Sequence, residues 1–231
     1  MQYLSQRLAS KPSPGRGEDA GGDALPAPQR ERILDAAERL IAENGCAGTS
    51  IEALVKEAGV SSVTFYEFFG DKEACFVAAF DRAVAWGIER MAAASREAGE
   101  GGELSWPEQV ATGLRATTRL IMEAPERARL CLVEAQVGGI ELNGRFEALL
   151  DRLAAKLREG RALPTASADL PATHEEATAG ALAWLLRERL ETGGAEKLDA
   201  LYPELIDIAL APYLGAGESR VAVSPAVQGD G

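Results

Sequence analysis

The sequence predicts an all-α protein of about nine helices. Apolar residues recur at helical spacing through most of the chain, and no alternating β-branched run is long enough to indicate a strand. Breaks rich in glycine and proline, such as EAGEGGELSWP (97–107) and LPTASADLPAT (163–173), separate the helical segments. These observations favour one ordered helical region, which we place at residues 29–214.

The two ends of the chain have a different composition from this region. Residues 1–28 are rich in proline, glycine, alanine and charge, which is typical of a disordered N-terminal arm. Residues 215–231 have a similar character and are expected to form a disordered C-terminal tail. Neither end contains an apolar run long enough for an export signal, and nothing later suits a membrane span. We therefore expect a cytoplasmic protein with no membrane partner.

The charge and the cysteines narrow the function classes further. The chain has 24 Lys+Arg against 36 Asp+Glu, a formal net charge of -12. This balance argues against a protein that coats nucleic acid or anionic membrane by bulk charge. The three cysteines lie in apolar stretches, which indicates reduced core residues and not a disulfide framework.

Local signals mark the boundaries of the first two helices. The segment 30–45 has a helical apolar stripe and ends at Gly45, a residue suited to the position just after a helix. Thr49 and Glu52 have the spacing of a capping box, which predicts a short helix that ends before Gly59.

Capping residues also predict the next two helices. Ser61 is expected to cap a third helix that runs to about Phe68, and Asp71 to cap a fourth, much longer one. Five further helical segments follow, with Pro203 acceptable in the first turn of the last. They are expected around residues 110–121, 125–139, 142–160, 174–192 and 203–214.

Two short helices joined by the turn at residues 58–61 are typical of a helix-turn-helix, whose second helix enters a DNA major groove. Hydroxyl groups on this second helix can bind bases and phosphates, and a valine methyl can contact thymine. A lysine at the start of the following helix suits a phosphate. The candidate DNA-contacting residues are Thr49, Ser61, Ser62, Val63, Thr64, Tyr66 and Lys72.

Residues 30–76 resemble the DNA-binding region of the tetracycline-repressor (TetR) family of bacterial regulators. The resemblance rests on an ordered series of elements, and the segment ALAPYLG near the C-terminus resembles a chain-terminal pattern of that family. It implies a homodimer with a DNA-binding domain, here residues 29–73, and an effector-binding and dimerisation domain, here residues 74–214. The elements of the series are Asn44-Gly45, Ala58-Gly59-Val60-Ser61, Phe65-Tyr66, Phe69 and Lys72.

The sequence also departs from this family at positions that meet DNA. Many members carry a basic residue where this chain has Ser62 or Glu67, and Phe68 stands where His or Tyr often meets a phosphate. Residues 30–73 contain five Lys/Arg against nine Asp/Glu, a difference of -4. A second hypothesis is therefore a TetR-like ligand sensor or interaction protein with weak or lost DNA binding.

An enzyme is the third hypothesis, and the sequence gives it little support. His174 is the single histidine, and no paired cysteine spacing or glycine-rich phosphate loop is present. We therefore expect no catalytic residues, no metal site and no cofactor.

The resemblance makes a repressor the first hypothesis: a homodimer that binds an inverted-repeat operator in double-stranded DNA and is released by a small-molecule effector. Polar or bulky residues on apolar helix faces are the candidates for the effector pocket. These are Trp86, Trp106, Thr117, Ile121, Met122, Glu134 and Phe146. Small residues beside one large anchor indicate the dimer interface. These are Ala177, Gly180, Ala181 and Trp184.

Overall fold

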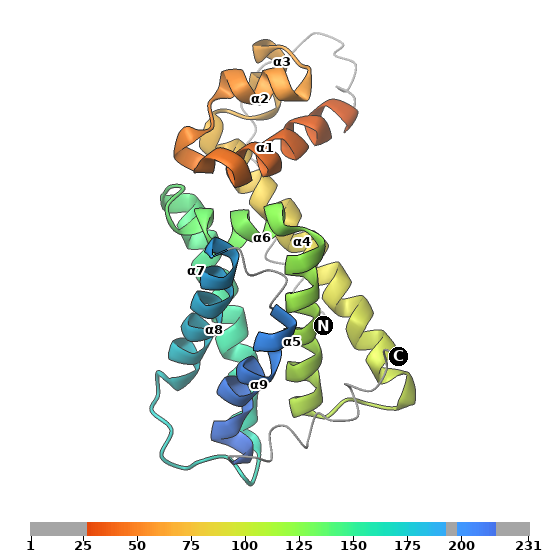
Figure 1. Ribbon diagram of the computed structural model, residues 1–231, viewed down its shortest axis with the longest axis vertical. Helices are drawn as coiled ribbons and strands as arrows, with labels where there is room; N and C mark the ends of the chain where they lie inside the picture. The colour runs from red at the N-terminus through yellow and green to blue at the C-terminus, as the bar shows by residue number, and fades with distance from the viewer. Residues whose placement is uncertain (1–26, 193–197, 216–231) are drawn as a thin grey trace, which may run out of the picture.

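The computed structural model describes residues 27–192 and 198–215, and this part of the chain is helical without strands, as the sequence predicts (Figure 1). The disordered tails expected at either end fall almost entirely outside the described residues. Three short 3-10 turns, η1 (Gly99–Gly101), η2 (Glu134–Gln136) and η3 (Glu159–Ala162), interrupt the α-helices. Within the described residues the nine α-helices are α1 (Ala27–Gly48), α2 (Ile51–Ala58), α3 (Ser62–Phe68), α4 (Lys72–Ala98), α5 (Trp106–Glu123), α6 (Pro125–Leu132), α7 (Ile140–Arg158), α8 (His174–Glu191) and α9 (Leu198–Leu214).

The caps of the N-terminal helices agree with the sequence at two positions and differ at one. Ser61 caps α3 by accepting from the amide of Thr64, and Asp71 caps α4 by accepting from the amide of Ala74. The cap of α2 is Ser50 and not Thr49, because Ser50 has the extended backbone and accepts from the amide of Ala53.

Gly45 marks a kink inside α1. Its φ of 72° lies in the left-handed region, so the helical path changes direction there before the last residues of α1. Gly59 also has a positive φ, 62°, and α2 ends there with backbone hydrogen bonds to the carbonyls of Lys56 and Val55. This turn sets the angle between α2 and α3.

Helices α1 to α3 form one end of the molecule, and α4 leads from them into the remaining helices (Figure 1). The core of this end includes Phe65, Phe69 and Ile33, and it continues into Leu130 of α6 and Leu142 of α7. A second core joins α5, α8 and α9 at the other end. Because α6 packs against α1, movements of α6 can reach the N-terminal helices.

None of the described helices combines the length and apolar character that crossing a membrane requires. All three cysteines are free, and burial raises the pKa of each thiol to about 12. The thiols therefore stay protonated at neutral pH; Cys46 and Cys75 are buried, whereas Cys131 is half-buried.

Candidate nucleic-acid interface and ligand cavity

Helix α3 has one buried face and one face open to solvent. Phe65 is fully buried and stacks on Phe69 with ring centroids 5.5 Å apart, so this side of α3 is fixed to the core. On the opposite side the apolar Val63 is 70% exposed and Tyr66 is 56% exposed. Such exposure of large side chains on a rigid short helix is typical of a contact surface.

The predicted DNA-contacting hydroxyls are placed differently from one another. Ser62 is exposed at the first position of α3. The Ser61 hydroxyl lies 3.0 Å from that of Thr64, so these two groups already bind each other. Thr49 is 1% exposed and its hydroxyl donates to the carbonyl of Gly45 at 2.8 Å. Thr49 therefore supports the kink of α1 and does not reach the exposed face.

Lys72 begins α4, where the sequence places a phosphate contact. Its Nζ donates to the carbonyl of Cys46 at 3.1 Å and lies 5.5 Å from the centroid of the Phe76 ring. The side chain is half-buried. These contacts tie the start of α4 to the kinked end of α1, so the ammonium has a structural partner before any DNA is bound.

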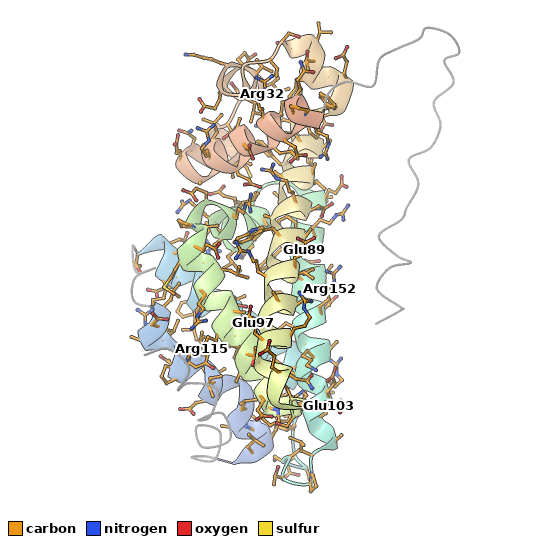
Figure 2. All side chains as sticks on the ribbon, turned by 90° about the vertical axis from the view of Figure 1, so that its right-hand side faces the viewer. Arg32, Glu89, Glu97, Glu103, Arg115 and Arg152 are labelled. Carbon is orange, nitrogen blue, oxygen red and sulfur yellow. The ribbon has the colours of Figure 1, made fainter. Side chains whose placement is uncertain are left out.

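Two exposed basic residues near the turn between α2 and α3 were missed by the sequence reasoning. Arg32 of α1 is exposed, makes no ion pair with the described residues, and reaches the turn (Figure 2). A Cβ atom at Gly59 would lie 3.8 Å from its Nη1. Lys56 of α2 is also exposed. Only the folding of α1 against α2 brings Arg32 to this place, and the sequence spacing gives no signal for it.

The negative charge counted over residues 30–73 is partly neutralised by arginines outside that range. Arg82 of α4 forms ion pairs with Glu31, Asp35 and Glu38 of α1, at 2.9, 2.8 and 2.8 Å. Arg127 of α6 also pairs with Glu38, at 2.9 Å. These carboxylates point toward α4 and α6, so they oppose DNA at the α3 face less than the count suggests.

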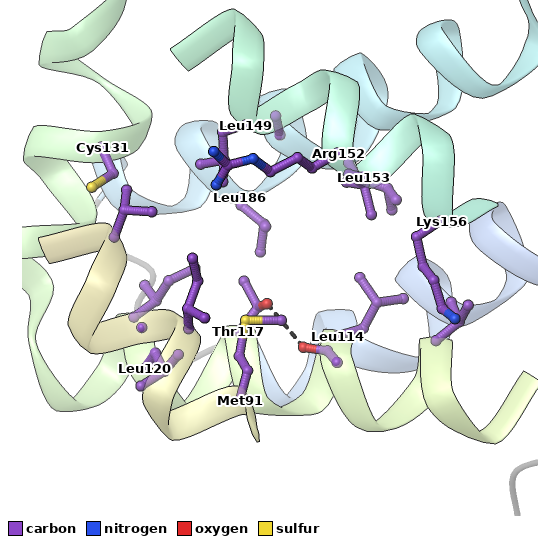
Figure 3. A pocket seen from close by; sticks show the side chains of 18 of the residues that line it. Met91, Leu114, Thr117, Leu120, Cys131, Leu149, Arg152, Leu153, Lys156 and Leu186 are labelled. Atoms are coloured by element: carbon purple, nitrogen blue, oxygen red, sulfur yellow. Dashed lines mark hydrogen bonds between the residues drawn. The ribbon is translucent and has the colours of Figure 1, made fainter. Parts of the chain in front are cut away.

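A large apolar cavity lies among α4, α5, α6, α7 and α8, with a volume of about 800 Å³. Figure 3 shows Cys131 of α6 at one end and Lys156 of α7 at the other, with Met91 and Thr117 between them. The Thr117 hydroxyl donates to the carbonyl of Gly113 at 2.9 Å. Its oxygen is therefore left to accept a hydrogen bond from a ligand. This size is within the range of small-molecule sites.

Charged groups occur at a few points of the cavity lining. Lys156 is held by Gln109 and Glu159 at 2.7 and 2.6 Å. Arg152 is exposed and projects over the cavity in Figure 3, and its charge acts on the carboxyl group of Asp81. Arg127 lies in the α6 part of the lining. Glu103 also lines the cavity, so an apolar ligand whose anionic group lies near Arg152 or Arg127 would fit this distribution.

Four of the seven predicted pocket residues line this cavity, namely Trp86, Thr117, Ile121 and Phe146. The other three do not. The Trp106 indole donates to the carbonyl of Lys156 at 2.9 Å, and Met122 packs on the core of α5, α8 and α9. Glu134 is buried on η2, and its Oε2 accepts from the amide of Cys46 at 2.9 Å. It therefore binds the end of α1 instead of the cavity.

The four residues predicted for a dimer interface share one face of α8. Ala177 and Ala181 are exposed, Gly180 is half-buried, and Trp184 is 61% exposed. In the part of the chain that the structure describes, no group of three or more His, Cys, Asp or Glu side chains could hold a metal ion.

The comparisons with known proteins decide the family of the N-terminal helices. The sequence model of the bacterial regulatory proteins of the tetR family matches residues 33–79, which cover most of α1, all of α2 and α3, and the start of α4. The N-terminal module belongs to the TetR family. A fatty acid metabolism regulator protein from Bacillus subtilis (strain 168) is 38% identical over 64 residues, 28% of this chain. The match spans about one third of that relative, 33% of its length.

Solved structures extend the likeness beyond the TetR module. The fatty acid degradation regulator FadR from Bacillus halodurans has a TM-score of 0.66 at 18% identity, over 83% of this chain and 98% of that one. FadR from Bacillus subtilis, solved in complex with stearoyl-CoA, has a TM-score of 0.65 at 22% identity, over 80% of this chain and 98% of that one. At these identities the likeness establishes a TetR-like fold for the helices that follow the module.

Proposed function

We propose that the protein is a DNA-binding transcriptional repressor that acts as a homodimer and is released when a small molecule occupies the cavity. The observation that carries the proposal is that one chain joins a TetR module with an exposed α3 to an apolar cavity of about 800 Å³. A dimer of such modules would bind an inverted repeat whose half-sites lie about 34 Å apart or somewhat more. Binding of the small molecule must favour a different spacing of the modules, because only a difference in affinity between states shifts DNA binding.

The cavity favours an elongated apolar ligand with an anionic end. Its walls are mainly leucine, isoleucine, valine and alanine side chains, and the exposed guanidinium of Arg152 projects over it (Figure 3). A structurally similar protein, FadR from Bacillus subtilis, was solved with stearoyl-CoA. A long-chain acyl-CoA combines an apolar chain with an anionic head, so it is the first candidate for this site.

The test begins with selection of a duplex from a random library by the full chain. Fluorescence anisotropy then measures the dissociation constant for that duplex, with and without stearoyl-CoA. We expect a value of about 10⁻⁸ M or tighter without ligand, and at least about tenfold weaker binding with it. Coenzyme A without an acyl chain is the control for the head group alone. A chain that selects no sequence would support the alternative of a sensor without DNA binding.

A matched pair of variants places the DNA on the proposed surface. Val63→Ala removes two methyl groups from the exposed face of α3 and should weaken the selected duplex by about 1 kcal/mol, or roughly fivefold. Val137→Ala is the control, because Val137 is 74% exposed but lies between η2 and α7. Equal effects of the two substitutions would show that α3 does not contact the bases.

A further inference from the structure

One cavity-lining side chain is bonded directly to α1. Arg127 of α6 lines the cavity, and its Nε donates to Oε2 of Glu38 at 2.9 Å. Among the described residues, no other side chain of the cavity lining makes a hydrogen bond or ion pair with α1, α2 or α3. We propose that Arg127 is the residue through which an occupant of the cavity changes the position of α1. This inference rests on the proposed function and names the contact that transmits it.

The ligand side of Arg127 is coupled to a second cavity residue. Its guanidinium carbon lies 4.8 Å from the centroid of the Trp86 ring, and Trp86 of α4 also lines the cavity. Stacking of a guanidinium on an aromatic face is sensitive to the relative position of the two groups. A ligand that moves Trp86, or that binds the guanidinium itself, therefore also changes the geometry of the bond to Glu38.

On the α1 side, the hydrogen bond between Arg127 and Glu38 can break without leaving the buried Glu38 carboxylate unpaired. Glu38 is buried, and its other oxygen, Oε1, accepts from Nε of Arg82 at 3.0 Å. If Arg127 turns away, the Glu38 carboxylate keeps Arg82 as its partner. Loss of both partners would be strongly unfavourable in a buried site, whereas loss of one is tolerable. The Glu38 carboxylate therefore links α1 to both α6 and α4 while Arg127 is in place, and to α4 alone once Arg127 has turned away.

The expected ligand effect is thus a change of partner for α1. In the structure α1 is held by α6 through Arg127 and by α4 through Arg82. Once the first link is weakened, α1 follows α4, and α2 and α3 move with it because they share its core. A small shift at one ion pair can reposition the whole module, since packed helices move as units.

The test compares three variants of the full chain. Arg127→Gln removes the link from the cavity side, and Glu38→Gln weakens it from the α1 side, because the amide is uncharged and has one acceptor oxygen for two arginines. Arg90→Gln is the matched control: Arg90 also stacks on Trp86, at 5.5 Å, and forms an interhelical ion pair with Glu123 at 2.8 Å, but it neither lines the cavity nor bonds α1. The readout is the ratio of dissociation constants for the selected duplex with and without saturating stearoyl-CoA.

We expect this ratio to be at least about tenfold in the wild type and in Arg90→Gln. It should fall below about twofold in Arg127→Gln and in Glu38→Gln. Tryptophan fluorescence titration with stearoyl-CoA confirms that each variant is saturated, and a thermal melt confirms that it is folded. Should Arg127→Gln fail to fold, Arg127→Lys keeps the charge but loses the planar guanidinium, and a reduced ratio is again expected.

The outcomes separate this inference from the proposed function. A wild-type chain whose DNA binding does not respond to stearoyl-CoA would overturn the proposed ligand response and, with it, the role of Arg127. A responsive wild type together with a fully responsive Arg127→Gln and Glu38→Gln would overturn the role of Arg127 and leave the proposed function intact. An equal loss in Arg90→Gln would also overturn it, because general loosening around Trp86 would then explain the effect.

Discussion

Replacement of Glu134 tests whether η2 holds the kinked end of α1. Glu134 is 7% exposed, and its Oε2 accepts from the amide of the buried Cys46 at 2.9 Å. Glu134→Ala removes a hydrogen bond to a charged group and leaves that amide without a partner, which costs about 2–3 kcal/mol of unfolding free energy. Glu134→Gln keeps an oxygen acceptor of the same size and loses only the charge, so its cost should be about 1 kcal/mol.

Urea unfolding followed by far-ultraviolet circular dichroism measures these differences at one fixed protein concentration, because association changes the midpoint. Hydrogen exchange at the Cys46 amide gives a local readout. A loss of 2–3 kcal/mol there corresponds to exchange roughly 30- to 150-fold faster. Glu141→Ala is the control, since Glu141 is exposed at the start of α7 and should change stability by less than about 0.5 kcal/mol. If Glu134→Ala matched this control in both measurements, the link between η2 and α1 would be refuted.

Three further predictions concern stability at acid pH, salt dependence and dimer formation. Burial by itself raises the pKa of Glu175, but hydrogen bonds from Arg161 and Tyr213 lower it by more, to about 2. The stabilisation of the fold by ionised Glu175 should therefore be complete above about pH 4.5 and be lost as the pH falls toward 2. Over this pH range, the difference in urea midpoint between the wild type and Glu175→Gln should shrink. Arg32→Gln should weaken DNA binding and flatten the slope of log affinity against log salt by about one unit per subunit. Arg96→Gln, an exposed arginine at the end of α4, should leave that slope unchanged. Sedimentation velocity should show that Ala181→Glu converts a dimer into monomers, whereas the control Ala85→Glu, at another exposed alanine on α4, should leave the dimer intact.

Much of the fold could be predicted because local signals determine it. The serine and aspartate caps of α3 and α4, the glycine after α2 and the helical apolar stripes act over a few residues. The error at the start of α2 has a local cause as well. Thr49 and Ser50 can both cap a helix, and the choice depends on which residue has the extended backbone after the kink at Gly45.

The candidate sites were predictable only where a residue's position on its own helix decides its role. Val63 and Tyr66 are exposed because Phe65 is buried on the same short helix. By contrast, Glu134 follows the apolar pattern of a pocket residue but binds the Cys46 amide, 88 residues away in sequence. Arg127 gave no signal at all, because its importance comes from two partners on α1 and α4. Such roles depend on tertiary contacts that no spacing in the sequence encodes.

Two buried carboxylates, those of Glu38 and Glu134, hold α1 at different points. Glu38 lies in the middle of α1 and faces Arg127, which lines the cavity, whereas Glu134 reaches the end of α1 at Cys46 and lies outside the cavity lining. The two attachment points are eight residues apart in sequence, and the kink at Gly45 lies between them. On the proposed mechanism a ligand weakens the first attachment and leaves the second in place. Helix α1 would then follow α4, to which Arg82 still binds it, while its Cys46 end stays attached to η2; the helix would therefore rotate instead of sliding as a whole.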